Sequence, residues 1–164
     1  AGFSLSEIGY INKIFGLAST IAGALLGGSM MARLGLYRAL MLFGILQAVS
    51  NFGYWVLAVT PPYLYSMAVV VAIENLCGGM GTAAFVALLM ALYKQAFSAT
   101  QFALLSALSA VGRTYLAGPL TPPLVDTLGW PGFFVVTVFI ALPGLVLLHW
   151  RRNEIHALDT SRAE

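Results

Sequence analysis

Two charged side chains, Glu74 and Arg113, lie well inside long apolar stretches of this 164-residue chain. An ionised side chain at the centre of a lipid bilayer costs at least about 2.5 kcal/mol, so such a residue is a functional-site candidate by default. At the rise of an α-helix, Glu74 lies roughly 15 Å below one end of its apolar stretch, and Arg113 lies roughly 20 Å above the opposite end of its own. Both side chains are therefore predicted near mid-membrane.

An antiparallel pair of helices can bring Glu74 and Arg113 within reach of each other, which leaves two interpretations. In the first, both face a polar central cavity, where they pair together or bind substrate and a proton. In the second, they form a buried ion pair that only fixes the arrangement of the two helices.

Three glycines, Gly78, Gly79 and Gly81, follow Glu74 within the same apolar stretch. Glycines in a membrane helix allow bending, or close approach of the backbone to a ligand. Glycine is also frequent in membrane helices generally, so an ordinary packing role stays open.

The sequence shows no pattern typical of an enzyme. It has one cysteine, Cys77, and no Cys/His spacing of a metal site, and no nucleophile has a base at a recognisable offset. Its glycines lie within apolar stretches and do not form a phosphate-binding loop. We therefore expect no catalytic residues, no metal and no cofactor, and nothing in the composition suggests nucleic-acid binding.

The elements that carry Glu74 and Arg113 are predicted to be transmembrane helices. The chain is 60% hydrophobic and only 9% charged, against about 25% charged residues in soluble domains. A span needs roughly 20 apolar residues, so the length allows about five. Residues 1–150 are predicted to form a partial C-terminal transmembrane bundle, and residues 151–164 a polar tail. The predicted spans cover residues 8–32, 38–59, 63–93, 100–127 and 131–150.

The positions of basic residues predict the orientation of these spans. With five spans, one face of the membrane receives Arg33, Arg38, Lys94, Arg151 and Arg152. The other face receives Glu7, Asp126 and the uncharged turn at 61–62. Basic loops stay in the cytoplasm, so the first face and the C-terminal tail are predicted to be cytoplasmic. Four spans would scatter these charges over both faces.

Small residues recur at four-residue spacing on several predicted spans, as at Gly23 and Gly27 or at Gly79 and Ala83. Such ridges let helix backbones approach closely in lipid. The pattern indicates a packed helical bundle.

The segment GGSMMARLGLYRAL, residues 27–40, resembles the cytoplasmic loop motif G-x-L-A-D-R-x-G-R-R-x-x-L of the major facilitator superfamily. Gly28, Arg33 and Gly35 fit the motif, and Arg38 adds a basic residue beside it. Ala32 stands where the motif has Asp, and Leu36 and Tyr37 stand where it has basic residues, so this copy is degenerate. The resemblance implies an all-α membrane protein whose five spans correspond to helices 8–12 of such a transporter.

A closer resemblance is to the AmpG-type muropeptide permeases of that superfamily. It is carried by FGILQ at 43–47, ENLCGGMGT at 74–82, FVALLM at 85–90 and SATQFALLSALSAVGR at 98–113. It implies import of N-acetylglucosaminyl-anhydromuramyl peptides by proton symport across the bacterial inner membrane, for peptidoglycan recycling and β-lactamase induction. For that substrate we expect Asn75, Arg113 and Tyr115 to bind carboxylates and sugar hydroxyls, and Glu74 to take the proton.

The same resemblance implies that the chain is a fragment, whose partners are the lipid bilayer, the N-terminal half of the transporter and helix 7. Two alternatives stay open from the sequence. One is another carrier of this fold for a large solute or a drug. The other is a membrane subunit or enzyme outside the transporters.

Overall fold

A computed structural model describes residues 5–92, 100, 103–104, 106–107, 111 and 118–160 of the chain. The described residues are helical and include no strand. Their elements are α1 (Leu5–Ile11), the π-helical turn η1 (Asn12–Gly16), α2 (Leu17–Leu34), α3 (Leu36–Val59), α4 (Leu64–Ala91), α6 (Gly118–Trp150) and α7 (Arg152–Thr160). This confirms the predicted all-α fold.

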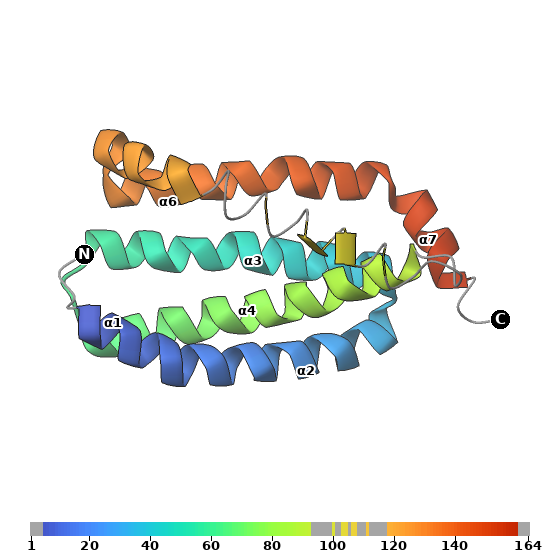
Figure 1. Cartoon of the computed structure of the whole chain (residues 1–164), viewed down its shortest axis with the longest axis horizontal. Coiled ribbons are helices and arrows are strands. Elements are labelled where there is room, and N and C mark those ends of the chain that lie inside the picture. Colours follow the sequence, from blue (N-terminus) through green and yellow to red (C-terminus); the bar gives the residue numbers. More distant parts are fainter. Residues whose placement is uncertain are drawn as a thin grey trace.

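Four helices of the described part are long and apolar enough to cross a membrane. They cover Ile8–Leu34, Leu36–Val59, Leu64–Ala91 and Pro119–Trp150. Twelve of the 28 residues of the predicted span 100–127, among them 112–117, lie outside the described residues, so the fifth span stays a prediction. One feature supports it, because α4 ends at one end of the bundle and α6 begins in the opposite half (Figure 1).

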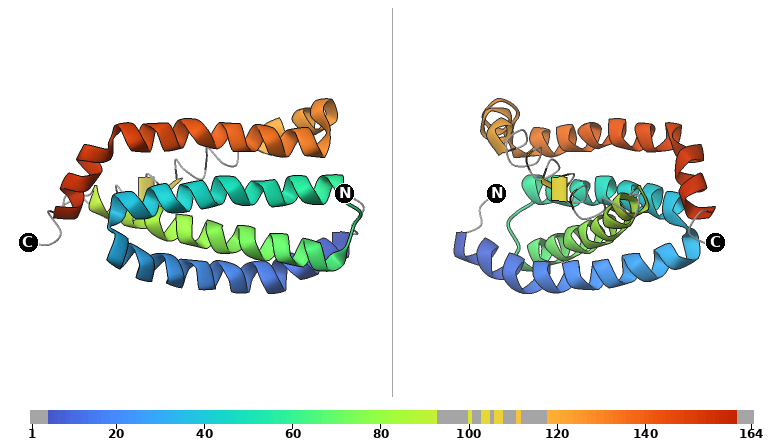
Figure 2. Two further views of the ribbon diagram at one scale, coloured as in Figure 1. Left: turned by 180° about the vertical axis from the view of Figure 1, so that it is seen from behind. Right: turned by 45° about the vertical axis from the view of Figure 1, so that its right-hand side comes forward.

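The long helices lie side by side along the bundle, with α4 between α2 and α3, and with α6 on the far side of α3 (Figures 1 and 2). Consecutive helices α2, α3 and α4 run antiparallel because their connections are very short. Gly35 alone joins α2 to α3, at φ 79°, and its N–H donates to the Met31 carbonyl oxygen at 3.0 Å. A positive φ strains other residues, so the glycine of the loop motif has a backbone role here.

Glycines bring α2 and α4 into close contact, as the four-residue spacing predicts. Gly23 and Gly27 are buried, and a Cβ atom at Gly27 would lie 2.7 Å from the Cα atom of Met80. In the same way, Gly79 of α4 lies against the backbone of Thr20 and Ala24. In lipid, such backbone contact supplies packing energy that apolar burial alone does not.

The turn η1 changes the register of the first span. Ile11 and Gly16 are both buried although they are five positions apart, a spacing that points to different faces of a regular α-helix. A π turn takes about one residue more than an α turn. It therefore lets both residues face α4.

Helix α6 is broken at Gly129, where the sequence predicts the end of one span and the start of the next. Gly129 has φ 67° and ψ 173°, outside the helical range, so α6 consists of two helices in succession. Pro131 follows the break, at a position in the first helical turn that suits proline.

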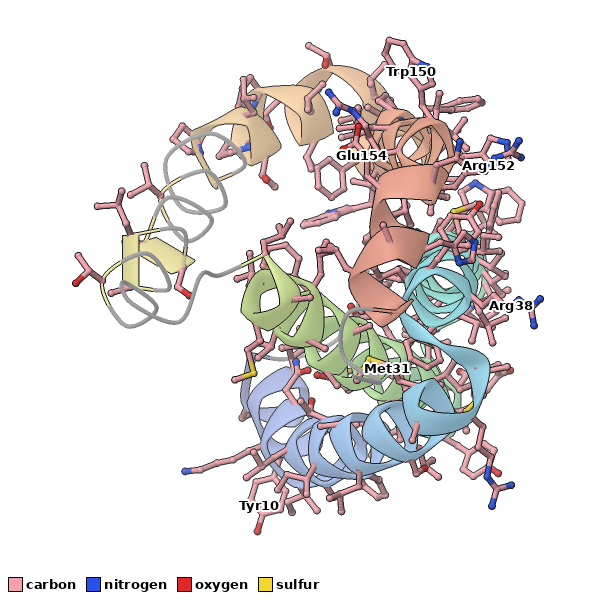
Figure 3. All side chains as sticks on the ribbon, turned by 90° about the vertical axis from the view of Figure 1, so that its right-hand side faces the viewer. Tyr10, Met31, Arg38, Trp150, Arg152 and Glu154 are labelled. Atoms are coloured by element: carbon pink, nitrogen blue, oxygen red, sulfur yellow. The ribbon has the colours of Figure 1, made fainter. Side chains whose placement is uncertain are left out.

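The predicted polar tail contains a helix that packs on the bundle. Ile155 of α7 is only 6% exposed and packs against Leu36 and Ala87. Tyr37 lies between two histidines, with its hydroxyl 3.0 Å from Nδ1 of His149 and its ring 4.8 Å from that of His156. Seen from this end of the bundle, Arg38 and Arg152 point outward on the same side (Figure 3).

These contacts give a physical reason for the degenerate motif. Two of the positions that differ from the superfamily pattern, Leu36 and Tyr37, contact α7, and Tyr37 also contacts α6. Leu36 is only 2% exposed, so a basic residue there would bury a charge, which costs free energy unless the charge is paired.

Candidate functional site

Glu74 lies near the middle of α4 and is directed at α3. Its side chain is half-buried, and each carboxylate oxygen accepts one hydrogen bond. Nε2 of Gln47 donates to Oε1 at 3.2 Å, and the hydroxyl of Tyr54 donates to Oε2 at 3.3 Å. We call Glu74, Gln47 and Tyr54 the Glu74 cluster.

The regular geometry of α3 explains how one carboxylate reaches both donors. Gln47 and Tyr54 are two helical turns apart, so both lie on the face of α3 that meets α4. Glycine at position 78 leaves room for the amide, since a Cβ atom there would lie 3.3 Å from Oε1 of Gln47.

The Glu74 cluster has acidic character and neutral donors. Among the residues that the structure describes, no basic side chain forms an ion pair with Glu74; the ion pair recorded there joins Arg151 to Glu154 at 2.7 Å. Hydrogen bonds to a carboxylate offset part of the cost of removing it from water. The arrangement can hold an ionised carboxylate, because each of its oxygens accepts a hydrogen bond from a neutral donor.

The predicted partner of Glu74 lies outside the described residues. Arg113 belongs to the undescribed part of the chain, as does Tyr115. Contact between Glu74 and Arg113 therefore stays a prediction.

Asn75 faces a different helix from its neighbour Glu74. Its Oδ1 accepts a hydrogen bond from the Thr20 hydroxyl of α2 at 3.2 Å, and its Nδ2 donates to the Val71 carbonyl oxygen at 2.8 Å. The Thr20 hydroxyl also lies 2.8 Å from the Gly16 carbonyl oxygen, at the end of η1. Asn75 thus links α4 to the π turn, and its role toward a substrate stays a prediction.

The glycines after Glu74 have three different surroundings. Gly79 packs against α2, Gly78 borders Gln47, and a Cβ atom at Gly81 would meet no atom within 4 Å. Helix α4 runs unbroken through all three. A role of these glycines in bending α4 stays a prediction.

An aromatic stack extends the Glu74 cluster to α6. The ring of Tyr54 stacks on Phe134 at 5.3 Å between centroids, with 16° between the planes. Phe134 in turn stacks on Trp130 at 6.1 Å, next to the break at Gly129. Tyr54 also lines a cavity of about 200 Å³ with Asn12, Trp130 and Phe134.

Sequence reasoning missed the two donors. A signal was present, because Gln47 and Tyr54 are polar side chains within an apolar span at a spacing of two helical turns. That spacing predicts a shared face, but it does not say which neighbouring helix the face meets.

The other predicted residues lie at the end of the bundle that carries α7. Arg33 and Arg38 flank the connection at Gly35 and are exposed, and Gly28 lies one turn earlier on α2. In the described ranges, no three His, Cys, Asp or Glu side chains form a group that could hold a metal ion.

Comparisons with known proteins identify the family. The model of the major facilitator superfamily matches residues 1–164, the whole chain. The anhydromuropeptide permease of Escherichia coli strain K12 is 59% identical over 147 residues, which are 90% of this chain and 30% of that protein. The putative transporter AmpG 4 of Rickettsia conorii is 35% identical over 158 residues, 94% of this chain and 37% of that protein.

An uncharacterized protein of Haemophilus influenzae is 38% identical over 156 residues, 91% of this chain and 36% of that protein. The chain thus spans about a third of the length of these relatives. The family resemblance predicted from the sequence is confirmed, and the chain belongs to the major facilitator superfamily, a family of membrane transporters and not of enzymes.

Proposed function

We propose that the chain is the C-terminal part of a permease that imports anhydromuropeptides together with protons. The identity of 59% to an anhydromuropeptide permease, over 90% of the chain, supports this substrate. The substrates expected from the resemblance are N-acetylglucosaminyl-anhydromuramyl peptides, taken up for peptidoglycan recycling.

Proton coupling is assigned to Glu74. The observation that carries this assignment is a half-buried carboxylate at mid-helix with one neutral donor on each oxygen. When a proton binds, the carboxyl group becomes a donor itself, and the oxygen that carries the proton becomes a weaker acceptor for its neutral donor. Protonation therefore changes the contact between α3 and α4.

Substrate binding is assigned to Arg113, Tyr115 and Asn75. A guanidinium group binds carboxylates by charge-assisted hydrogen bonds, and hydroxyl and amide groups bind sugar hydroxyls. Gly78, Gly79 and Gly81 are proposed to let α4 bend during transport.

We propose the bacterial inner membrane as the location, with α7 in the cytoplasm. The connection between α2 and α3 and the connection between α6 and α7 lie at the same end of the bundle (Figure 1). Arg33, Arg38, Arg151 and Arg152 lie at these connections. This asymmetry supports a cytoplasmic position for that end.

The chain is expected to work only with the rest of the transporter. Sites of such carriers lie between two helical halves that rock about them, and the chain spans about a third of its relatives. The proposed partners are therefore the N-terminal half and helix 7.

The test is uptake of a labelled anhydromuropeptide by the full-length permease in cells or vesicles, with and without a proton uncoupler. We expect the uncoupler to abolish accumulation, Glu74→Gln to lose proton-driven accumulation, and Arg113→Lys to weaken substrate binding. Asp126→Asn and Arg152→Lys are matched controls, since both residues are exposed at the ends of the bundle. Accumulation that survives the uncoupler would refute proton symport, and wild-type uptake in both test variants would remove both assignments.

A further inference from the structure

Tyr54 makes contacts with two helices at once. Its hydroxyl donates to Glu74 of α4, and its ring stacks on Phe134 of α6. Through Phe134 the stack continues to Trp130, and Phe133 packs edge-on against Phe134 at 5.4 Å. Tyr54 of α3 therefore contacts both α4 and α6 through one side chain.

We infer that Tyr54 is a positioning residue for proton binding at Glu74, held in place by the aromatic stack of α6. This inference rests on the proposed proton symport and adds a residue to its mechanism. Tyr54 does not carry the proton. It fixes the direction of one hydrogen bond to the carboxylate, and the stack fixes Tyr54.

The geometry explains why the ring contact matters. Stacking on Phe134, with 16° between the planes, restricts the plane of the Tyr54 ring, and the O–H bond of a phenol prefers to lie in that plane. Aromatic pairs of this kind stabilise by about 0.5–1.5 kcal/mol beyond their area burial. The hydroxyl is thus presented to Oε2 of Glu74 in a defined direction.

The hydrogen bond links charge to helix position. With Glu74 ionised, Tyr54 donates to the carboxylate; with Glu74 protonated, the carboxyl group donates to the Tyr54 oxygen, or the contact opens. Either change acts on a ring that also packs against α6. Proton binding on α4 is thereby transmitted to the part of α6 that follows the break at Gly129.

The charged and titratable neighbours of Glu74 are few in the described part of the chain. Tyr54 faces it from α3, and Cys77 lies one turn further along α4 and is buried. Thr20 on α2 and Phe134 on α6, which lie in this region, do not titrate. The side-chain contacts that the structure describes for Glu74 in these residues are therefore its hydrogen bonds with Gln47 and Tyr54.

The test is Tyr54→Phe in the purified full-length permease, because this change removes the hydroxyl and keeps the ring on Phe134. The pH titration is followed by infrared spectroscopy, through the band of the protonated Glu74 carboxyl group. Glu74→Gln identifies this band, because the band is missing in that variant. A hydrogen bond to a charged group favours the ionised form about tenfold, so the midpoint is expected to rise by about one pH unit. Tyr65→Phe is the matched control, since Tyr65 is 82% exposed on α4.

A second variant, Phe134→Leu, keeps the hydroxyl but removes the stacking partner, and we expect a smaller rise of the midpoint. If Tyr54→Phe does not accumulate in the membrane, Phe134→Leu provides the test of the inference instead. An unchanged titration midpoint in Tyr54→Phe overturns the inference. If only Phe134→Leu is obtained, an unchanged midpoint in that variant overturns it. The titration needs no transport, so uptake that resists an uncoupler would refute proton symport separately.

Discussion

The contact between α2 and α4 gives a sharp test of the packing, through Gly23→Ala. A Cβ atom at Gly23 would lie 2.9 Å from the carbonyl carbon and 3.0 Å from the Cα atom of Leu76, and closer still to the carbonyl oxygen. Ordinary contact needs 3.4–4 Å, and the obstacle is helix backbone, which cannot rotate away as a side chain can. The two helices have to separate along their shared face.

The clash is expected to lower the free energy of unfolding by about 2–3 kcal/mol, the upper part of the range for overpacking. Alanine also favours helix over glycine by about 1 kcal/mol, which reduces the net effect. Gly28→Ala is the matched control, because a Cβ atom there meets nothing within 4 Å on the same helix. It gains the same helix propensity without the clash.

The assay is thermal unfolding of the full-length permease in detergent. We expect the midpoint of Gly23→Ala to lie roughly 5 °C below that of Gly28→Ala. Equal midpoints in the two variants would refute the close backbone contact, as would a destabilised Gly28→Ala.

Two further predictions concern the end of the bundle that carries α7. Gly35→Ala forces alanine to φ 79° and should lower the free energy of unfolding by about 1–3 kcal/mol. Thermal unfolding checks this against Gly144→Ala, where the added Cβ atom has open space and φ is not positive. Equal midpoints in the two variants would contradict the prediction. Ile155→Ser removes the apolar contact of α7 with Leu36, so protease cleavage of α7 should be at least about tenfold faster in inside-out vesicles. Ala157→Ser on the exposed side is the control, and equal cleavage rates would show that Ile155 does not hold α7.

The sequence was sufficient to predict the helical membrane fold and the close contact at Gly23 and Gly27. Both follow from strong local signals, since apolar length sets a span and small residues at four-residue spacing set a ridge. The break at Gly129 was also predictable, because Gly-Trp-Pro is typical of a helix boundary.

The partners of Glu74 were not predictable in the same way. Hydropathy gives the depth of a residue along a helix, but it does not give the rotation of that helix about its axis. Glu74 and Asn75 are adjacent in sequence and contact α3 and α2 respectively. Only the packed arrangement shows which helix each of them meets.

The packing of α7 was missed for a related reason. Residues 152–160 are polar in composition, and the buried Ile155 and the ring of His156 hold the helix against the bundle. A few apolar side chains are a weak signal in a polar segment. The contact is recognised only in the folded structure, where Leu36 lies on the surface that Ile155 packs against.

The π turn at Asn12–Gly16 makes the first span tolerant of a change in length. The turn holds one residue more than a regular α-helix requires, and Lys13 within it is exposed. Deleting Lys13 would therefore convert the turn to ordinary α-helix. Ile11 and Gly16 would then be one α turn apart and would still lie on a common side. The same deletion in α2 would turn Gly23 away from Leu76. Natural relatives that differ by a single residue in this span are therefore expected to carry the insertion or deletion at the π turn.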